Sequence, residues 1–196
     1  MTDFFTDMTL AQMLGQIAGL FALGFCIAGF ANKNDDRLMV LLISANVAFV
    51  LMFAFFQSWT AAALTLLVIV RIELARRFQG NWRLMLGLLA VSGLAAWATW
   101  QSITDIFAVL AMTFGTVGMF MLRGIPLRIM LGLAAFSWML NNIVIGSVGG
   151  MLAEAMVLVT NIITIIRLYR LREKFPEVVS GTVVSPDSGQ EESAGR

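Results

Sequence analysis

The Lys and Arg residues of this chain fall in four clusters, and the sequence between the clusters is almost wholly apolar. Each interval is long enough to cross a bilayer twice, because a helix of about 20 apolar residues spans roughly 30 Å of hydrocarbon. Basic residues stay on the cytoplasmic side of membrane proteins. The spacing therefore predicts an odd number of crossings, with the N-terminus outside and the C-terminus cytoplasmic. The clusters are Lys33/Arg37, Arg71/Arg76/Arg77/Arg83, Arg123/Arg128, and Arg167/Arg170/Arg172/Lys174 with Arg196.

Composition supports the same class of protein. Of the 196 residues, 59% are hydrophobic and 13% are charged, whereas a soluble domain carries about 25% charged residues. Too little polar surface remains to face water, so the lipid bilayer is the expected partner. There is no basic patch interleaved with exposed aromatic residues, and nucleic acid is therefore not expected as a partner. The composition leaves open whether the protein binds a small-molecule substrate and whether it forms a homo-oligomer.

The chain contains no histidine, which excludes a Ser-His-Asp triad, a Cys-His pair and a His-ligated zinc site. The single Cys26 lies in an apolar run, where we expect a buried and inert thiol. We therefore expect no enzymatic activity, no catalytic residue, no metal and no cofactor. An intramembrane enzyme is the least favoured class of function.

The apolar segments predict an all-α polytopic membrane protein with seven transmembrane helices. The joints between segments are short, which makes consecutive helices antiparallel neighbours. They include Gln57-Ser58, Gln79-Gly-Asn81, Gln101-Ser102 and Gly124-Ile-Pro126. The predicted spans are 9–31, 37–56, 58–77, 82–100, 103–122, 127–145 and 148–170.

An internal repeat with an offset of about 90 residues superposes the basic clusters and the joints. One crossing separates the halves, so both run the same way and form two parallel three-helix repeats joined by a linker helix. Coincidence among apolar helices is the alternative. Matching pairs are Ala22/Ala111, Phe25/Phe114, Gly29/Gly118, Arg37/Arg128, Met39/Met130, Ser58/Ser147 and Arg77/Arg167.

The repeat divides the chain into five parts. Residues 173–196 are rich in Pro, Gly, Ser and Glu, and such a segment buries too little surface to offset its ordering entropy. We therefore expect a disordered cytoplasmic tail. The expected parts are an extracytoplasmic N-terminus at 1–8, a first triple-helix bundle at 9–78, a linker helix at 79–101, a second triple-helix bundle at 102–172 and the tail at 173–196.

Two stretches resemble a known family. The first runs Leu14-Gly-Gln-Ile-Ala-Gly-Leu-Phe-Ala22, followed by Phe30, Lys33, Arg37 and Ser58-Trp-Thr-Ala-Ala62 up to Arg71. The second is Asn161-Ile-Ile-Thr-Ile-Ile-Arg167. Together they are similar to the YgjV family of bacterial inner membrane proteins, over roughly residues 9–172. The resemblance implies a multi-pass protein of the bacterial inner membrane and carries little about function.

The layout of three, one and three helices also resembles the SWEET and PQ-loop transporters. That resemblance implies a substrate path between two triple-helix bundles. Those transporters bend at prolines inside their spans, whereas the prolines here, Pro126, Pro176 and Pro186, are predicted to lie outside the spans. Either glycines such as Gly24, Gly29, Gly115 and Gly118 supply the bending, or the rocking mechanism does not apply.

Glu154 is the acidic residue predicted deepest in the membrane, about six residues and about 9 Å into the last span. Polar side chains at this depth usually face the protein interior or a wet cavity. Reversible protonation of this carboxyl group, coupled to transport, is one hypothesis. A static glutamate that forms hydrogen bonds or reaches the interface is the other.

Two amides and an aromatic residue lie close together in the sixth span: Trp138, Asn141 and Asn142. An aromatic face beside amide donors is a common way to hold a sugar or an amphipathic ligand. Asn46 occupies a similar depth in the second span. The alternative is that these amides join neighbouring helices by hydrogen bonds.

Arg71 and Asn161 correspond in the repeat, and Arg71 lies about 20 Å below the start of its span. The two residues are candidates for an inner gate, although Arg71 could instead snorkel to the cytoplasmic headgroups. Glu73 should face away from Arg71 and pair with Arg76 or Arg77. The full candidate substrate path is Asn46, Arg71, Trp138, Asn141, Asn142, Glu154 and Asn161.

The leading hypothesis for function is a small-solute transporter with its path between the two bundles. The alternative is a non-transporting membrane receptor or assembly protein that acts through its helix faces or its tail. Deleting residues 177–196 separates them, because a transport path should survive the loss of the tail.

Overall fold

The computed structural model describes residues 8–31 and 35–174, and within these ranges the chain is helical with no strand. Seven α-helices follow one another with short connections, and a single 3-10 turn, η1 (Ile103–Asp105), precedes α6. The helices are α2 (Leu10–Ala31), α3 (Asp35–Phe55), α4 (Trp59–Arg77), α5 (Trp82–Thr99), α6 (Ile106–Met121), α7 (Gly124–Ile145) and α8 (Val148–Lys174).

The helix boundaries correct three predictions. Gly124-Ile-Pro126, predicted as a joint, is the first turn of α7, so Pro126 lies inside a helix. Proline is tolerated there because the first N–H groups of a helix have no partner within it. The second of the seven helices, α3, begins at Asp35 rather than 37, and α8 runs to Lys174, which includes two residues assigned to the tail. The rest of the tail and residues 1–7 lie outside the described residues.

Five of the helices in the described ranges are long and apolar enough to cross a membrane: α2, α5, α6, α7 and α8. The apolar part of α3 is shorter and comprises Val40–Phe55. The helix α4 ends in a charged segment that contains Arg71, Glu73, Arg76 and Arg77. Composition alone therefore supports five spans, and α3 and α4 complete the bundle.

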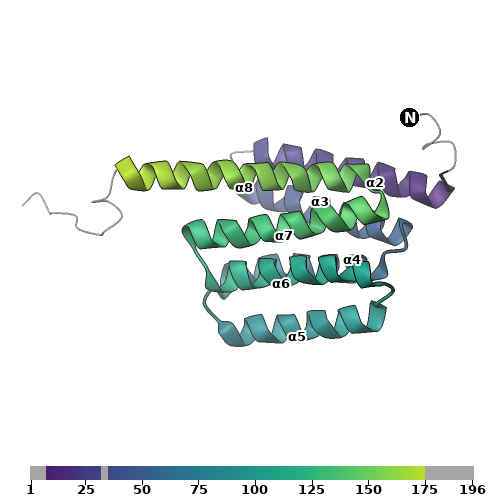
Figure 1. Cartoon of the computed structure of the whole chain (residues 1–196), viewed down its shortest axis with the longest axis horizontal. Coiled ribbons are helices and arrows are strands. Elements are labelled where there is room, and N and C mark those ends of the chain that lie inside the picture. Colours follow the sequence, from purple (N-terminus) through teal and green to yellow (C-terminus); the bar gives the residue numbers. More distant parts are fainter. Residues whose placement is uncertain (1–7, 32–34, 175–196) are drawn as a thin grey trace, which may run out of the picture.

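Six helices form a closed ring of neighbours. Each helix packs on the next in the order α2, α3, α4, α6, α7, α8 and back to α2, whereas α5 packs mainly on α4 and α6 from outside the ring (Figure 1). The buried residues of α5 are Leu88, Ser92 and Ala96, which share one face because they lie four residues apart. Trp97, on another face of α5, is 81% exposed.

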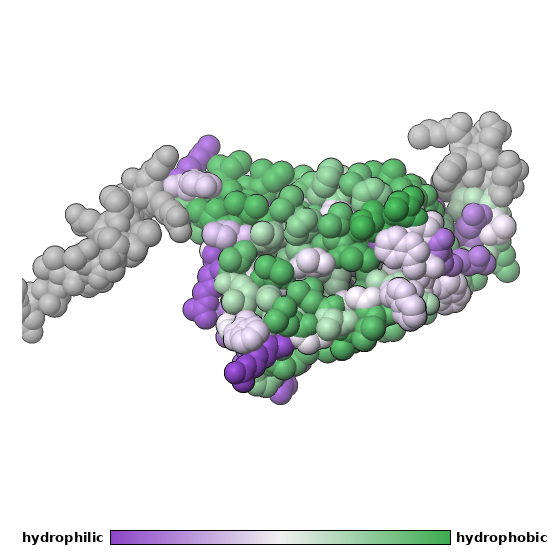
Figure 2. Space-filling model, turned by 60° about the horizontal axis from the view of Figure 1, so that its bottom comes forward, coloured by the Kyte–Doolittle hydropathy of each residue, from purple (hydrophilic) through white to green (hydrophobic). Residues whose placement is uncertain are grey.

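The connections between helices gather at two ends of the bundle. The α3–α4, α5–α6 and α7–α8 connections lie at the end where α2 begins, and the α4–α5 and α6–α7 connections lie at the other end (Figure 1). This alternation is the antiparallel arrangement that the short joints predict. Between the ends, the visible surface is a belt of hydrophobic side chains with hydrophilic residues at its edges (Figure 2).

A buried aspartate joins three elements at the first of these ends. The Asp105 Oδ2 atom accepts hydrogen bonds from the backbone N–H groups of Gln101 (2.7 Å) and Ser102 (3.2 Å) and from the Thr60 hydroxyl (3.0 Å). The same hydroxyl lies 2.6 Å from the Thr99 carbonyl oxygen. The start of α4, the end of α5 and the start of α6 are therefore held together by one side chain. The sequence alone did not reveal this role.

Glycines bring α2 and α8 into direct backbone contact. A Cβ atom at Gly149 would lie 2.4 Å from the carbonyl carbon of Gly19, so no larger side chain fits. Gln16 reinforces the contact, because its Nε2 donates to the Gly146 carbonyl oxygen (2.6 Å) and its Oε1 accepts from the Val148 N–H (3.0 Å). The Gly15-Gln-Ile-Ala-Gly19 segment is a packing element, as small residues four apart usually are.

Candidate functional site

Four buried side-chain atoms in the described part of the chain have no hydrogen-bond partner. They are Arg71 Nε, Asn141 Nδ2, Asn142 Oδ1 and Asn161 Oδ1. All four belong to the substrate path that the sequence predicts. Buried polar groups are nearly always hydrogen-bonded, so each unsatisfied atom calls for an explanation, such as water, an ion or a ligand. Two of the four atoms are donors and two are acceptors.

These residues occupy two levels along the bundle. Asn141 and Asn142 lie in the last turns of α7, about 5 Å from the end where α7 meets α8. Arg71 and Asn161 lie deeper, about 18 to 20 Å from the starts of α4 and α8 at the same end. Glu154 lies between the two levels, about 9 Å into α8.

The Arg71 side chain is buried, with 7% of its surface exposed. Its guanidinium lies against α6, where Nη1 is 3.5 Å from the Met112 carbonyl oxygen and 3.7 Å from the Met112 Sδ. That oxygen already accepts a shorter bond, 2.7 Å, from the Thr116 hydroxyl. The guanidinium has five N–H donors, so its hydrogen-bonding capacity is largely unused. It is turned into the bundle rather than snorkelling to the surface.

A glycine makes room for this guanidinium. A Cβ atom at Gly115 would lie 2.2 Å from the Nη1 atom of Arg71 and 2.8 Å from its Cζ atom. The head group therefore lies directly on the backbone of α6. Glu73, two residues beyond Arg71, faces elsewhere and pairs with Arg77, as the sequence predicts. Within the described ranges, Arg71 forms no ion pair with any acidic residue.

Glu154 is partly buried, and its carboxylate accepts no hydrogen bond from the described residues. Its charge interacts with that of Arg71 across the interior of the bundle, although the two groups are too far apart for an ion pair. The charge of Glu154 also acts on the buried thiol of Cys26 on α2. The two intramembrane charges that the sequence singled out therefore act on each other from α4 and α8 without being in contact.

The α7 residues contact the neighbouring helix α8 and, across the ring, α3. The Asn142 Nδ2 donates to the Trp138 carbonyl oxygen (3.0 Å), and its Oδ1 lies where a Cβ atom of Gly150 would come within 2.4 Å. The Trp138 ring stacks on Phe53 of α3, with 5.5 Å between centroids. The tryptophan therefore joins α3 to α7, and the two asparagines keep one unsatisfied atom each.

The remaining predicted residues bond to their own helices. The Nδ2 atoms of Asn46 and Asn161 donate to the carbonyl oxygens of Leu42 (2.8 Å) and Val157 (3.0 Å). Asn46 is partly buried, whereas Asn161 is buried and keeps a free Oδ1 atom. No hydrogen bond joins Asn46 to Asn141 within the described residues. Sequence analysis did not single out Met112 as the contact of Arg71, or Gly115 as the residue that makes room for it.

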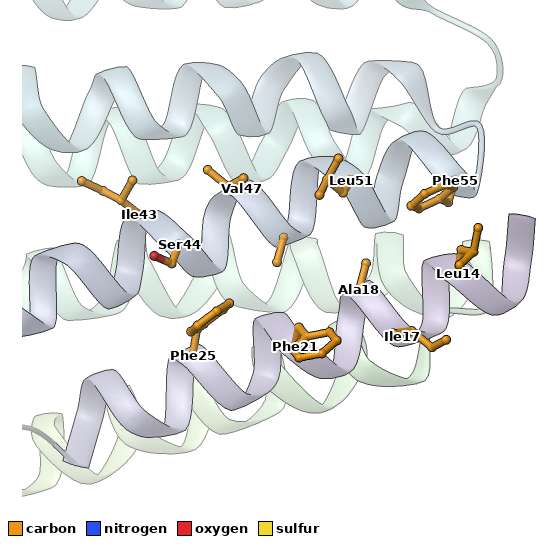
Figure 3. Close-up of a pocket in the computed structure, with 11 residues that line it drawn as sticks. Leu14, Ile17, Ala18, Phe21, Phe25, Ile43, Ser44, Val47, Leu51 and Phe55 are labelled. Carbon is orange, nitrogen blue, oxygen red and sulfur yellow. The ribbon is translucent and has the colours of Figure 1, made fainter.

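An apolar groove lies elsewhere, between α2 and α3. It has a volume of about 520 Å³, and Phe21 and Phe25 of α2 face Ile43, Val47 and Leu51 of α3 across it (Figure 3). Its one polar side chain, Ser44, donates to the Val40 carbonyl oxygen of its own helix. None of the seven residues of the predicted path lines this groove.

A helical bundle with an apolar belt, and with its charged groups at the ends or buried in the centre, defines a multi-pass integral membrane protein. The sequence model of the family Imp-YgjV, described as bacterial inner membrane protein, matches residues 13–172. The chain belongs to this family and is a multi-pass protein of the bacterial inner membrane. It is 24% identical to the inner membrane protein YgjV of Escherichia coli (strain K12) over 169 residues, which cover 86% of this chain and 90% of that protein. No solved structure matches the chain.

Proposed function

We propose that this protein is a small-solute transporter whose path runs between two pseudo-symmetric three-helix bundles. The observation that carries the proposal is the set of four unsatisfied polar atoms on α4, α7 and α8. Buried polar groups in a membrane are costly and commonly mark the route of a substrate or an ion. Here they occur at two depths, as expected of a path with successive binding positions.

The proposal includes seven crossings and the internal repeat. The order of neighbours supports the repeat, because exchanging α2, α3 and α4 for α6, α7 and α8 reproduces the same ring of contacts. Matched positions also agree in burial: Ala22 and Ala111 are both fully buried, and Arg71 and its counterpart Asn161 are both buried with only a few per cent of their surface exposed. In this proposal α5 is the linker helix of the layout of three, one and three helices that resembles the SWEET and PQ-loop transporters.

Reconstitution tests the transport proposal. Purified protein in liposomes should let at least one class of small radiolabelled solute, neutral, anionic or cationic, enter faster than it enters protein-free liposomes. Asn142→Leu should slow that uptake at least tenfold, because it removes an amide from the first level of the path. Ser92→Ala, at a buried position of α5 outside the ring, is the matched control and should leave uptake unchanged. If every solute enters liposomes with and without the protein at the same rate, the proposal is refuted.

We also propose that Glu154 couples transport to protons. The groups that act on it electrostatically are Arg71 of α4 and Cys26 of α2, and α7 presents no titratable side chain to it among the described residues. Glu154→Gln should therefore remove the pH dependence of uptake and leave the rate insensitive to an imposed pH gradient. Glu73→Gln, at an exposed position, is the control. Uptake by Glu154→Gln that still follows the pH gradient would contradict the role.

The proposed orientation places the N-terminus outside the cell and the C-terminus in the cytoplasm. In a Cys26→Ser background, a cysteine introduced at the exposed Ser102 should react in intact cells with a membrane-impermeant thiol reagent. A cysteine introduced at the exposed Gln79, at the opposite end of the bundle, should react only after the membrane is opened. The reverse pattern would invert the topology.

The second candidate function is a non-transporting membrane receptor or assembly protein. The apolar groove between α2 and α3 favours it, since a partner helix could use such a surface (Figure 3). The reconstitution assay distinguishes the two, because a receptor of this kind moves no solute.

A further inference from the structure

The buried guanidinium of Arg71 carries a charge that the described residues leave largely uncompensated. Its two hydrogen-bond contacts are long, to the Sδ atom of Met112 and to the Met112 carbonyl oxygen that another donor already uses, and its Nε has no partner. A buried charge of this kind is expensive unless something of opposite charge completes it. Arginine presents its donors in a planar fork that matches a carboxylate in a bidentate manner.

We propose that Arg71 binds the carboxylate of a small, water-soluble, monovalent organic acid, and that this acid is the class of solute transported. The binding of the acid by Arg71 is inferred from the geometry at α4 and α6. The transport of that acid rests on the proposed transport function. The absence of a side chain at Gly115 lets the guanidinium lie against α6, and the Nε atom of Arg71 has no partner and is free to bind the acid.

The charge at the site favours a single negative charge on the ligand. Arg71 contributes one positive charge, and the charge of Glu154 acts on it without forming an ion pair. When Glu154 is protonated, the pair carries a net charge of plus one, which one carboxylate neutralises. When Glu154 is ionised, it repels the incoming anion. Binding of the acid and of a proton therefore favour each other, and the coupling is reciprocal.

The depth of Arg71 in the bundle favours a soluble acid over a lipid headgroup as its ligand. The helix α4 continues for six residues beyond Arg71, which is about 9 Å, before it ends at Arg77. A lipid phosphate lies at the membrane surface, whereas this guanidinium is buried against α6 within the bundle. The oxyanion chemistry of the two sources is the same, so the experiment includes an arm for each.

The test is ligand-induced stabilisation of the purified full chain in detergent. Acetate, L-lactate and pyruvate are the probes, and L-lactamide is a neutral analogue of lactate. At least one of the three acids should raise the melting temperature with saturation, and lactamide should not. Arg71→Gln should abolish the shift, and Arg71→Lys should weaken binding about tenfold because the fork is lost. Gly115→Ala should also weaken it, and Arg76→Gln, an exposed cation on the same helix, should bind normally.

The outcomes separate this inference from transport itself. Three results would each overturn the proposed binding of an acid by Arg71, even if neutral solutes cross the liposomes. They are equal shifts of the melting temperature with lactate and lactamide, no shift with any acid, and an undiminished shift in Arg71→Gln. Binding of an acid without uptake would leave the anion site standing and refute transport. The protein could also be stabilised by phosphatidylglycerol micelles in a manner that depends on Arg71, and not by the acids. That result would assign the site to a lipid headgroup and overturn the proposal.

Discussion

Replacing Arg71 by methionine should stabilise the protein and abolish its transport activity. The wild-type guanidinium is buried with two long contacts to Met112 and no ion pair among the described residues. Exchanging an incompletely paired buried charge for an apolar side chain of similar length often stabilises a protein by about 1 to 4 kcal/mol. A gain of that size would be measured by reversible unfolding in mixed micelles.

The opposite signs of these two effects identify the role of the arginine. A residue kept for packing or for membrane insertion would lose stability when replaced, whereas a residue kept for ligand binding loses activity and gains stability. Arg76→Met on the same helix is the control, and at this exposed position it should change stability by less than about 0.5 kcal/mol. If Arg71→Met is destabilised and transports normally, the arginine is structural.

Gly149→Ala should separate α2 from α8 and destabilise the bundle by about 1 to 3 kcal/mol, the usual range for overpacking. The added Cβ atom would lie 2.4 Å from the Gly19 carbonyl carbon and 2.6 Å from the Leu20 nitrogen. Backbone atoms in the middle of a helix cannot move aside as a flexible side chain can. The helices must therefore shift, and the shift would also weaken the two hydrogen bonds of Gln16.

Gly24→Ala is the matched control on α2. A Cβ atom at Gly24 meets nothing within 4 Å, so the substitution should be neutral or stabilise the helix by up to about 1 kcal/mol. Both variants would be compared in the same mixed-micelle unfolding assay. Equal stability of Gly149→Ala and the wild type would show that α2 and α8 do not approach as closely as their backbones indicate.

The helices themselves could be predicted from the sequence because apolar length and short polar joints are local signals. The predicted fourth span, 82–100, agrees with α5 (Trp82–Thr99) to within one residue. The prediction failed where a local signal was ambiguous. Gly124-Ile-Pro126 has the composition of a turn, yet a proline in the first turn of a helix costs little, and α7 starts at Gly124.

The candidate site could be predicted residue by residue but not contact by contact. The depth of Arg71 follows from counting along its helix, and its polarity makes it conspicuous. Gly115 lies more than forty residues later in the chain than Arg71. The contact of the guanidinium with this glycine depends on the rotation and order of α4 and α6. The contact of Gly149 with Gly19 depends in the same way on α2 and α8. Periodicity within one helix does not specify either relation.

The position of α5 outside the ring has a consequence for how the sequence can vary. Its buried positions Leu88, Ser92 and Ala96 contact other helices, whereas Leu94 and Trp97 are among the most exposed apolar residues of the described structure. Lipid accepts any apolar side chain of suitable size, so substitutions at the exposed positions are limited by hydropathy alone. In this family α5 is therefore expected to diverge fastest of the helices, while the stripe of residues that faces α4 and α6 stays small and constant.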